Sequence, residues 1–311
     1  MKLEVQCKAP AKVNLVLRVI GTRPDGYHLI ESLMLPVSLY DRLRLRVDSG
    51  RATRGRVVCS VDGPERVADG PDNLAALAAG AVLEAAKSRA DVSIELTKHI
   101  PSGAGLGGGS SDAATILRVL PQMLGVRLAR PELHRMATAL GADVPFFLQG
   151  RPAWATGIGE KLSGAGNLPA FHLCIAVPRT RVNTAWAYRH ALPQRAHRAV
   201  ADGRGHEADA DRLRLSVKSL SCLFSNDFER GVKRVGGDAG RDVSRLLTTL
   251  NKLGAVATVM SGSGSAVVGA FDSEQSARNA ASNLIANGLG DVAHAVRVLN
   301  RLPAYRENEG R

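Results

Sequence analysis

The chain has 311 residues, 45% hydrophobic and 23% charged, which is an ordinary globular composition and excludes disorder over most of its length. Its 41 basic and 29 acidic residues give a net charge of +12. Because the basic residues form no stripe interleaved with stacking aromatics, this charge favours an enzyme for anionic small molecules over a nucleic-acid binder.

The first half of the chain mixes predicted strands and helices. Strict alternation at 42–47 is typical of a strand with one solvated face, and the Ala-rich segment 74–86 is typical of a helix with Asp72 or Asn73 as its N-cap. The other predicted elements are strands at 5–9, 13–19 and 92–97, a turn at 23–26, a helix with Ala113, Ile116, Leu117, Leu120 and Leu124 on one stripe, and a helix at 132–140.

A Gly- and Pro-rich passage at 157–169 interrupts this pattern, and we place a domain boundary there, which gives domains 1–165 and 166–311. In the second half, strands separated by helices suggest an α+β sandwich of ferredoxin-like type. Its predicted elements are strands at 171–177, 255–260, 266–271 and 292–299, a helix at 274–287, and a solvated Arg-rich loop at 193–214.

Four cysteines lie far apart and form no metal-type pair, so we expect buried free thiols in a reducing compartment: Cys7, Cys59, Cys174 and Cys222. The first residues lack the apolar core of a signal peptide, and no run approaches the ~18 apolar residues of a membrane helix. We therefore expect a cytoplasmic protein without a membrane partner.

A glycine-rich segment is the most informative part of the sequence. Residues 101–112 read PSGAGLGGGSSD, after a predicted strand and at the start of an amphipathic helix. Glycines allow positive φ and close backbone approach, so several N–H groups can converge on one anion, and the helix N-terminus adds unpaired amides. The segment predicts a polyphosphate site rather than a flexible loop without a ligand, with Ser110 and Ser111 as hydroxyl donors to a phosphate or its metal.

Two known phosphate-binding motifs fit this segment poorly. A Walker A loop ends in Gly-Lys-Ser/Thr, whereas Ser110 follows the last glycine here. Gly103, Gly105 and Gly108 match the dinucleotide pattern G-x-G-x-x-G, but residues 99–101 separate the strand from the loop, and no acidic residue ends a second strand about 20 positions later. A nicotinamide-dependent dehydrogenase is therefore the second hypothesis.

Two charged residues in apolar surroundings are candidates for catalysis. Lys12 lies in APAKVNL, where its ammonium needs solvent or an anion; the alternative is an edge-strand residue that prevents aggregation. Asp143 lies in GADVPFF, between the helix at 132–140 and an expected apolar strand, where it can accept a hydroxyl proton or simply form a turn. Phosphoryl transfer needs positioning, charge neutralisation and a proton acceptor, and these two residues meet the last two needs.

Three segments together resemble the GHMP kinase superfamily: the Lys12 strand, the glycine loop 103–111, and the late turn MSGSGS at 260–265. Further segments resemble the branch of that superfamily whose substrate is a methylerythritol carrying a cytidine diphosphate. These span nearly the whole chain in order: KVN at 12–14, GTRPDGYH at 21–28, DNL at 72–74, GADVPFF at 141–147, GIGEK at 157–161 and NDFE at 226–229.

The resemblance implies a two-domain α+β fold, with an N-terminal domain like domain 2 of ribosomal protein S5, a C-terminal ferredoxin-like α/β sandwich, and an active site in the cleft between them. It also implies transfer of the γ-phosphate of ATP, with Mg²⁺, to the 2-hydroxyl of the methylerythritol unit in isoprenoid precursor synthesis. We expect no nucleic-acid partner and a monomer or weak homodimer. The alternatives are a homoserine- or mevalonate-type kinase, or a nucleic-acid module, since ribosomal proteins contain domains like the N-terminal one.

The resemblance also implies a role for individual residues. Asp143 would be the general base, and Lys12 would stabilise both its carboxylate and the attacking oxygen. Asn14 would bind the substrate diol or orient Lys12. The ATP-binding residues would be Asn73 and Lys98 near the adenine, together with Pro101, Ser102, Gly103, Ala104, Gly105, Leu106, Gly107, Gly108, Gly109, Ser110 and Ser111; the metal ligands are unknown.

The cytidine end of the substrate would be held by aromatic residues. Tyr27 would stack on the base beside His28. In relatives a second aromatic ring often stacks on the other face of the base, and the matching position here is Tyr188. The alternative for Tyr27 is an aromatic ring that packs within its own turn.

Overall fold

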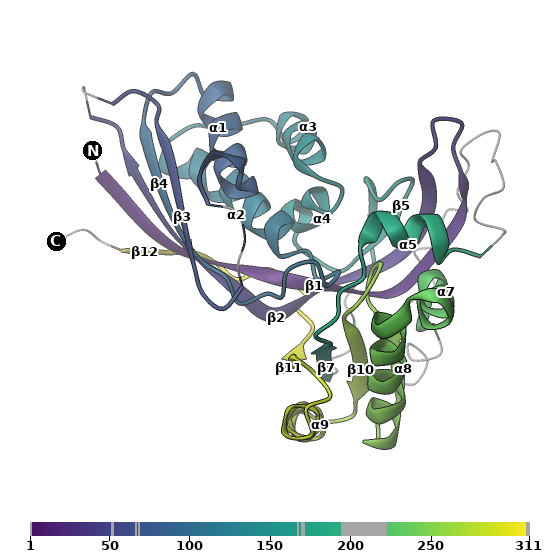
Figure 1. Cartoon of the computed structure of the whole chain (residues 1–311). Coiled ribbons are helices and arrows are strands. Elements are labelled where there is room, and N and C mark those ends of the chain that lie inside the picture. Colours follow the sequence, from purple (N-terminus) through teal and green to yellow (C-terminus); the bar gives the residue numbers. More distant parts are fainter. Residues whose placement is uncertain are drawn as a thin grey trace.

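A computed structural model describes residues 2–50, 53–65, 67, 69–166, 168, 172–193 and 223–308, which form two β-sheets with helices packed on them (Figure 1). The first sheet is built on β1 and β2, two 21-residue antiparallel strands. Its spatial order is β12 (Arg306–Asn308), β1 (Lys2–Thr22), β2 (His28–Asp48), β4 (Asp91–Thr97) and β3 (Val57–Asp62). Short strands extend it: β5 (Ala153–Thr156) pairs with β2, β6 (Lys161–Gly164) with β5, and β8 (Ser225–Asn226) with β1.

The second sheet is four-stranded and antiparallel throughout. Its order is β11 (Val292–Arg297), β7 (His172–Val177), β10 (Val267–Phe271) and β9 (Ala257–Met260), so the first strand in sequence lies between the last and the third. With the connecting helices α5 (Thr184–His190), α7 (Asp227–Val235), α8 (Gly237–Lys252) and α9 (Glu274–Ala286), this order confirms the ferredoxin-like sandwich. Neither sheet is a doubly wound parallel one, so the G-x-G-x-x-G match does not belong to a dinucleotide-binding fold.

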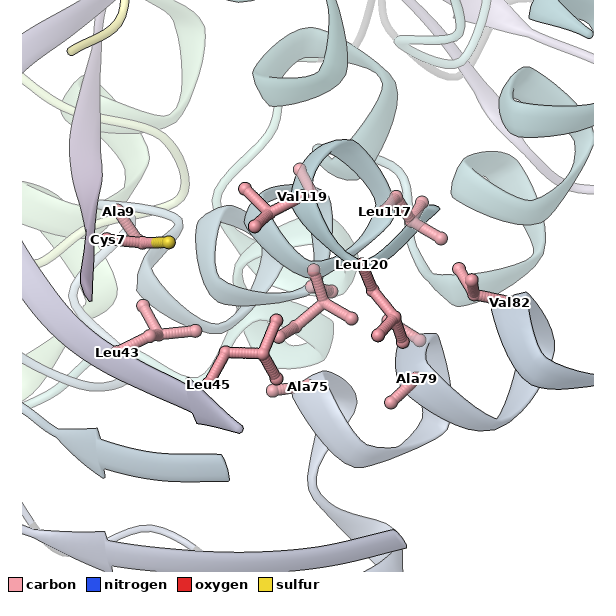
Figure 2. Close-up of a cluster of buried hydrophobic side chains, with 14 of the residues drawn as sticks. Cys7, Ala9, Leu43, Leu45, Ala75, Ala79, Val82, Leu117, Val119 and Leu120 are labelled. Atoms are coloured by element: carbon pink, nitrogen blue, oxygen red, sulfur yellow. The ribbon is translucent and has the colours of Figure 1, made fainter. Parts of the chain in front are cut away.

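The middle of β1 is buried without interruption from residue 9 to residue 17, because both faces of the sheet are covered there. Val5, Cys7 and Ala9 belong to the core cluster under helices α1 (Leu74–Ala85) and α2 (Gly108–Met123), as Figure 2 shows for part of that cluster. Three later residues of the strand, at 11, 13 and 15, belong instead to the cluster shared with the second sheet. The change of cluster coincides with a register shift between residues 10 and 11, a β-bulge position of the kind that tolerates the proline found there.

Most predicted elements of the first half are confirmed. The helix at 74–86 is α1 with Asn73 as its N-cap, and the alternating segment 42–47 buries Leu43, Leu45 and Val47. The separate strands expected at 5–9 and 13–19 are one continuous strand, β1. The helix at 132–140 is α3 (Arg130–Leu140).

The expected strand after Asp143 is wrong, because that segment forms α4 (Val144–Gln149). Pro145 occupies the first turn, where a missing N–H costs nothing, and an apolar run of five residues has no periodicity that separates a strand from a helix.

The second half follows its predicted order, with β7, β9, β10, α9 and β11 close to the expected bounds. The Gly- and Pro-rich passage contains β6, which belongs to the first sheet, whereas β7 begins the second. We keep the boundary near residue 165 as a proposal. The loop expected at 193–214 lies, beyond Pro193, outside the described residues, as does Cys222.

The cysteines of the described residues, Cys7, Cys59 and Cys174, are free and buried, as expected. Burial raises the pKa of the Cys174 thiol to about 12. No described helix combines the length and the apolar character that a membrane crossing needs.

Asn226 ties the second half to the turn at 260–265. Its side chain accepts a hydrogen bond from the Phe228 N–H (2.8 Å) and donates to the carbonyls of Met260 (2.6 Å) and Gly262 (2.8 Å). Asn183, in contrast, caps α5 with one accepted bond from the Trp186 N–H.

We predict that Asn226→Asp lowers the free energy of unfolding by about 2–4 kcal/mol, since it removes two donated hydrogen bonds and turns a carboxylate toward two carbonyls. Asn183→Asp keeps its capping acceptor and is the matched control, with a change of less than about 0.5 kcal/mol. Urea unfolding of both variants measures the difference; equal stabilities would show that the amide donors of Asn226 contribute nothing.

Candidate active site

The glycine-rich segment connects β4 to α2, as its sequence predicts. Gly103, Gly105 and Gly107 have φ values of 65°, 81° and 72°, a region that side chains with a Cβ avoid. Gly107 is the N-cap of α2 and has no side chain to satisfy the amides of the first turn. Those N–H groups also have no acceptor within the helix, so they form an anion-binding site at its positive end.

Two of these glycines are needed because other segments approach the loop closely. A Cβ on Gly105 would lie 2.6 Å from the carbonyl oxygen of Ser261, in the turn at 260–265. A Cβ on Gly107 would lie 2.9 Å from the Phe147 ring and 3.1 Å from Cγ of Lys12. The loop is therefore packed between the late turn on one side and β1 and α4 on the other.

A cavity of about 380 Å³ opens over this loop. Its lining brings together most of the predicted ATP-binding residues: Asn73, Lys98, Pro101, Ser102, Gly103, Gly105, Leu106, Gly107, Gly108, Gly109 and Ser110. Ala104 and Ser111 do not line it. The Ala104 carbonyl accepts the Ala266 N–H (3.1 Å), and the buried Ser111 hydroxyl has no partner among the described residues.

Lys12 and Asp143 form an ion pair, with 3.3 Å between Nζ and Oδ2. The Lys12 side chain is only 5% exposed, whereas that of Asp143 is 36% exposed at the N-cap of α4. Lys12 also donates to Oδ1 of Asn14 (2.7 Å), and Asn14 donates to Ser32 Oγ (2.7 Å). Because the Ser32 hydroxyl donates to the Val16 carbonyl, it must accept from the Asn14 amide, and this fixes the Asn14 carbonyl toward Lys12.

Beneath the loop, a second lysine is buried between two carboxylates. Nζ of Lys98 is hydrogen-bonded to Asp41 and lies 2.8 Å from Asp112 Oδ2. The other oxygen of Asp41 accepts the N–H groups of His99 (2.6 Å) and Ile100 (2.9 Å), at the junction of β4 and the loop. The cluster thus joins β2, the start of the loop and the N-terminal half of α2. Lys98 lines the cavity, as expected of a residue predicted near the adenine. Its ammonium, however, is hydrogen-bonded to these two carboxylates.

Two carboxyl groups share one ammonium in this cluster, so ionisation of both would leave an excess of negative charge. Burial, opposed by Lys98 and reinforced by Asp41, raises the pKa of Asp112 to about 8. Burial alone would lower the pKa of Lys98, but the two carboxylates outweigh it and raise that pKa. Oδ1 of Asp112 has no hydrogen-bond partner among the described residues.

Of the residues predicted to bind cytidine, Tyr27 lies in the turn between β1 and β2, His28 begins β2, and Tyr188 lies on α5. The Tyr188 ring lies 5.2 Å from His28 and 4.8 Å from Phe228, between ring centroids. Burial, followed by the nearby Asp143 carboxylate, raises the pKa of Tyr188 to about 12. Tyr27 is 60% exposed in its turn, which leaves its ring free to stack on a ligand.

The sequence analysis missed four residues that shape this site. Three of them contact residues that are distant in the sequence: Ser32 by 18 positions, Asp41 by 57 and Ser261 by 247. No local sequence pattern indicates such contacts. Asp112 did carry a signal, because it is an acidic residue placed next to a predicted phosphate site.

Models of two protein families match the chain. Residues 73–151 match the GHMP kinases N terminal domain, and residues 210–289 match the GHMP kinases C terminal domain. The first match contains the whole glycine-rich loop and Asp143, and the second contains the turn at 260–265.

Relatives over nearly the full length are named 4-diphosphocytidyl-2-C-methyl-D-erythritol kinase. The protein of Citrifermentans bemidjiense is 39% identical, with 95% of this chain and 99% of the relative covered. That of Syntrophotalea carbinolica is 40% identical, with 94% and 98% covered.

Solved structures show the same fold. A crystal structure of 4-(cytidine 5'-diphospho)-2C-methyl-D-erythritol kinase has a TM-score of 0.75 and 34% identity, with 94% of this chain and 98% of that one covered. Homoserine kinase from Cytophaga hutchinsonii has a TM-score of 0.65 at 16% identity, with 98% and 97% covered, and so shares the fold alone.

The raised pKa of Asp112 predicts how stability changes with pH. Between pH ~4 and ~8 the folded chain keeps a proton on Asp112 that the unfolded chain has released, so this carboxyl makes the fold less stable as the pH rises through that window. Asp112→Asn has no such proton to lose. We predict that its free energy of unfolding falls less steeply with pH than that of the wild type, by up to about 1.4 kcal/mol per pH unit.

Urea unfolding at pH 5, 6, 7 and 8 measures the two slopes. Asp238→Asn, at an exposed ion pair with Arg241, is the matched control and leaves the slope unchanged. Parallel curves for Asp112→Asn and the wild type would mean that Asp112 is ionised over the whole range.

Proposed function

The chain belongs to the GHMP kinase superfamily and, within it, to the family of 4-diphosphocytidyl-2-C-methyl-D-erythritol kinases, and we propose that it transfers the γ-phosphate of ATP to the 2-hydroxyl of that substrate. The products are the 2-phosphate and ADP, in the synthesis of isoprenoid precursors. We further propose that it works in the cytoplasm as a monomer or weak homodimer, without nucleic acid.

One observation carries the proposal: the uncapped N-terminus of α2 and the Lys12–Asp143 pair are neighbours. Gly107, the N-cap, lies against Cγ of Lys12. Gly141 precedes Asp143 by two residues, and a Cβ on it would lie 3.9 Å from the Ser110 hydroxyl in the first turn of α2. A phosphate chain held by the first amides of α2 therefore ends near a carboxylate that is partly exposed and paired with a lysine. This support favours phosphoryl transfer over simple nucleotide binding.

ATP fits the cavity by its chemistry as well as its position. The loop amides suit the phosphates, and Asn73, Leu74 and Ile100 line the cavity beyond them, where an apolar and amide-bearing wall suits a base. We propose that Mg²⁺ arrives on the nucleotide and neutralises its phosphate charge. No group of three or more His, Cys, Asp or Glu among the described residues is arranged to hold a metal, which fits an ion bound mainly by phosphate oxygens.

The ion pair gives each partner a role in the proposed reaction. The substrate hydroxyl oxygen forms a bond to the γ-phosphorus while the bond from that phosphorus to the β-phosphate oxygen breaks, and ADP leaves. Asp143 accepts the hydroxyl proton as the new bond forms. Asn14 holds the Lys12 ammonium beside Asp143 and the attacking hydroxyl oxygen, so this ammonium offsets the negative charge that develops on that oxygen.

Two assays test this function. A coupled ADP-release assay should show turnover with 4-diphosphocytidyl-2-C-methyl-D-erythritol and little with homoserine or mevalonate. Turnover with either of the latter instead would make the chain another small-molecule GHMP kinase. Thermal stabilisation by ATP with magnesium, but not by NAD, is expected in parallel.

Replacement of the proposed base should slow the chemical step and leave ATP binding nearly intact. We predict that Asp143→Asn lowers kcat by about 10²- to 10⁴-fold, since the hydroxyl proton loses its acceptor, while the Kd for ATP changes little. Steady-state kinetics and calorimetric titration measure the two quantities. Asp238→Asn serves as control; wild-type turnover in Asp143→Asn would remove this residue from the reaction.

The exposed Tyr27 ring should matter for the cytidine end of the substrate. Stacking on a base contributes ~1–3 kcal/mol, so Tyr27→Ala should raise KM for the cytidyl substrate by about 5- to 150-fold. Tyr27→Phe keeps the ring and should stay near the wild type. If KM is the same in both variants, the base binds elsewhere.

A further inference from the structure

A second cavity, of about 1140 Å³, lies on the helical side of the first sheet and shares no lining residue with the nucleotide cavity. It is formed by the C-terminal half of α2, the connection to α3, the helices α3 and α4, and the strand β6. The three helices lie together on one side of the long strands (Figure 1). Nothing in the proposed reaction uses this groove.

The groove is lined by cations with little compensation. Its basic residues are Arg118, Arg127, Arg130, Arg151 and His134. None of the four guanidinium groups forms an ion pair within the described residues, unlike Arg44 and Arg46 on the outer face of the sheet, which pair with Glu4 and Glu95.

The one carboxylate in the lining is Glu160, and it is turned toward its own loop. It accepts the N–H of Ile158 at 2.7 Å and lies against Gly157. It therefore does little to offset four guanidinium charges. The groove is a positive region without a partner of its own.

Arg118 is the residue that most requires an anion. It projects from the middle of α2 and is half-buried, and burial, opposed by the nearby Cys7, lowers the pKa of its guanidinium. A charge removed from water without a partner is unfavourable, so an anion beside it would recover the lost solvation. Arg127, Arg130 and Arg151 are exposed and surround the same space.

The floor of the groove is aliphatic rather than polar. Leu128, Leu133, Leu148 and Leu162 line it while only partly buried against the core. A bare inorganic anion would satisfy the arginines but leave these side chains facing water. A ligand with an apolar body and a charged head would satisfy both.

We propose that this groove is a binding site for an amphiphilic phosphate, an organic anion whose apolar body lies on the leucine floor and whose phosphate head is held by the arginines. Guanidinium groups suit this head because they donate paired hydrogen bonds to phosphate oxygens. The site is also placed to influence turnover: α2 begins at the phosphate loop, and α4 begins directly after Asp143. Both helices contribute to the groove.

Octyl phosphate, below its micellar concentration, is the probe for calorimetric titration of the full chain. We expect saturable one-to-one binding that weakens with salt and persists when ATP is bound. Octanol and inorganic phosphate, which each lack one half of the probe, should bind at least about tenfold more weakly. Inorganic phosphate binding as tightly as octyl phosphate would overturn the amphiphile assignment, and displacement by ATP would place the probe in the nucleotide cavity instead.

Variants locate the site. Arg118→Gln should weaken octyl phosphate binding by about tenfold or more, as loss of a charge-assisted contact does. Because Arg118 is partly buried, the exposed Arg130→Gln gives a second test that does not threaten folding. Arg44→Gln, on the outer face of the sheet, is the matched control. Unchanged binding in both groove variants, or no saturable binding at all, would refute the site.

Discussion

The Lys12 ammonium is buried in the interior between the Asp143 carboxylate and the Asn14 carbonyl, and the arrangement of the active site depends on that contact. A buried lysine is tolerated only if its charge is paired and its remaining protons are accepted. Alternation along β1 provides for both. Residues 11, 13 and 15 enter the apolar cluster shared with the second sheet, which leaves 12 and 14 for the polar network. One face of this strand therefore packs in the core, and the other positions the residues of the proposed active site.

The phosphate loop meets a related requirement by different means. A helix that begins without a cap keeps its first amides for a ligand, but it gives up the stability that a capping side chain would supply. The buried cluster of Asp41, Lys98 and Asp112 offsets this by fixing both ends of the loop. Asp41 accepts backbone N–H groups at one end, and Asp112 holds the N-terminal half of α2 at the other. The Ser261 turn then closes the loop from the second half of the chain. Rigid anchoring lets the amides stay unpaired and still point to one place.

α2 and α4 link the active site to the arginine groove. Each helix has one end at the reaction centre and residues further along that line the groove, so a shift of either helix would be felt at both places. The basic residues of the chain thus differ in whether a carboxylate neutralises them. Arg44 and Arg46 on the outer face of the sheet form ion pairs, whereas the four groove arginines form none within the part of the chain that the structure describes.

The sequence by itself determined the elements with strong local signals. The glycines at 103, 105 and 107 indicate positive φ, the pair Asp72 and Asn73 indicates a helix start, and alternation at 42–47 indicates a half-exposed strand. Resemblance to a known superfamily then supplied the roles that we propose for Lys12 and Asp143. Local patterns failed where tertiary contacts decide: the apolar run after Asp143 became a helix.

Only the tertiary structure decided which polar groups meet. The Asn14 N–H donates to the Ser261 hydroxyl across 247 positions, and the Lys98 ammonium donates to Asp41 across 57. Neither spacing leaves a periodic trace in the sequence. The physical reason is that a buried charge or amide is satisfied by whatever the fold brings within hydrogen-bond distance. Periodicity sets which face a side chain occupies, but the packing of two sheets and their helices sets what it finds there.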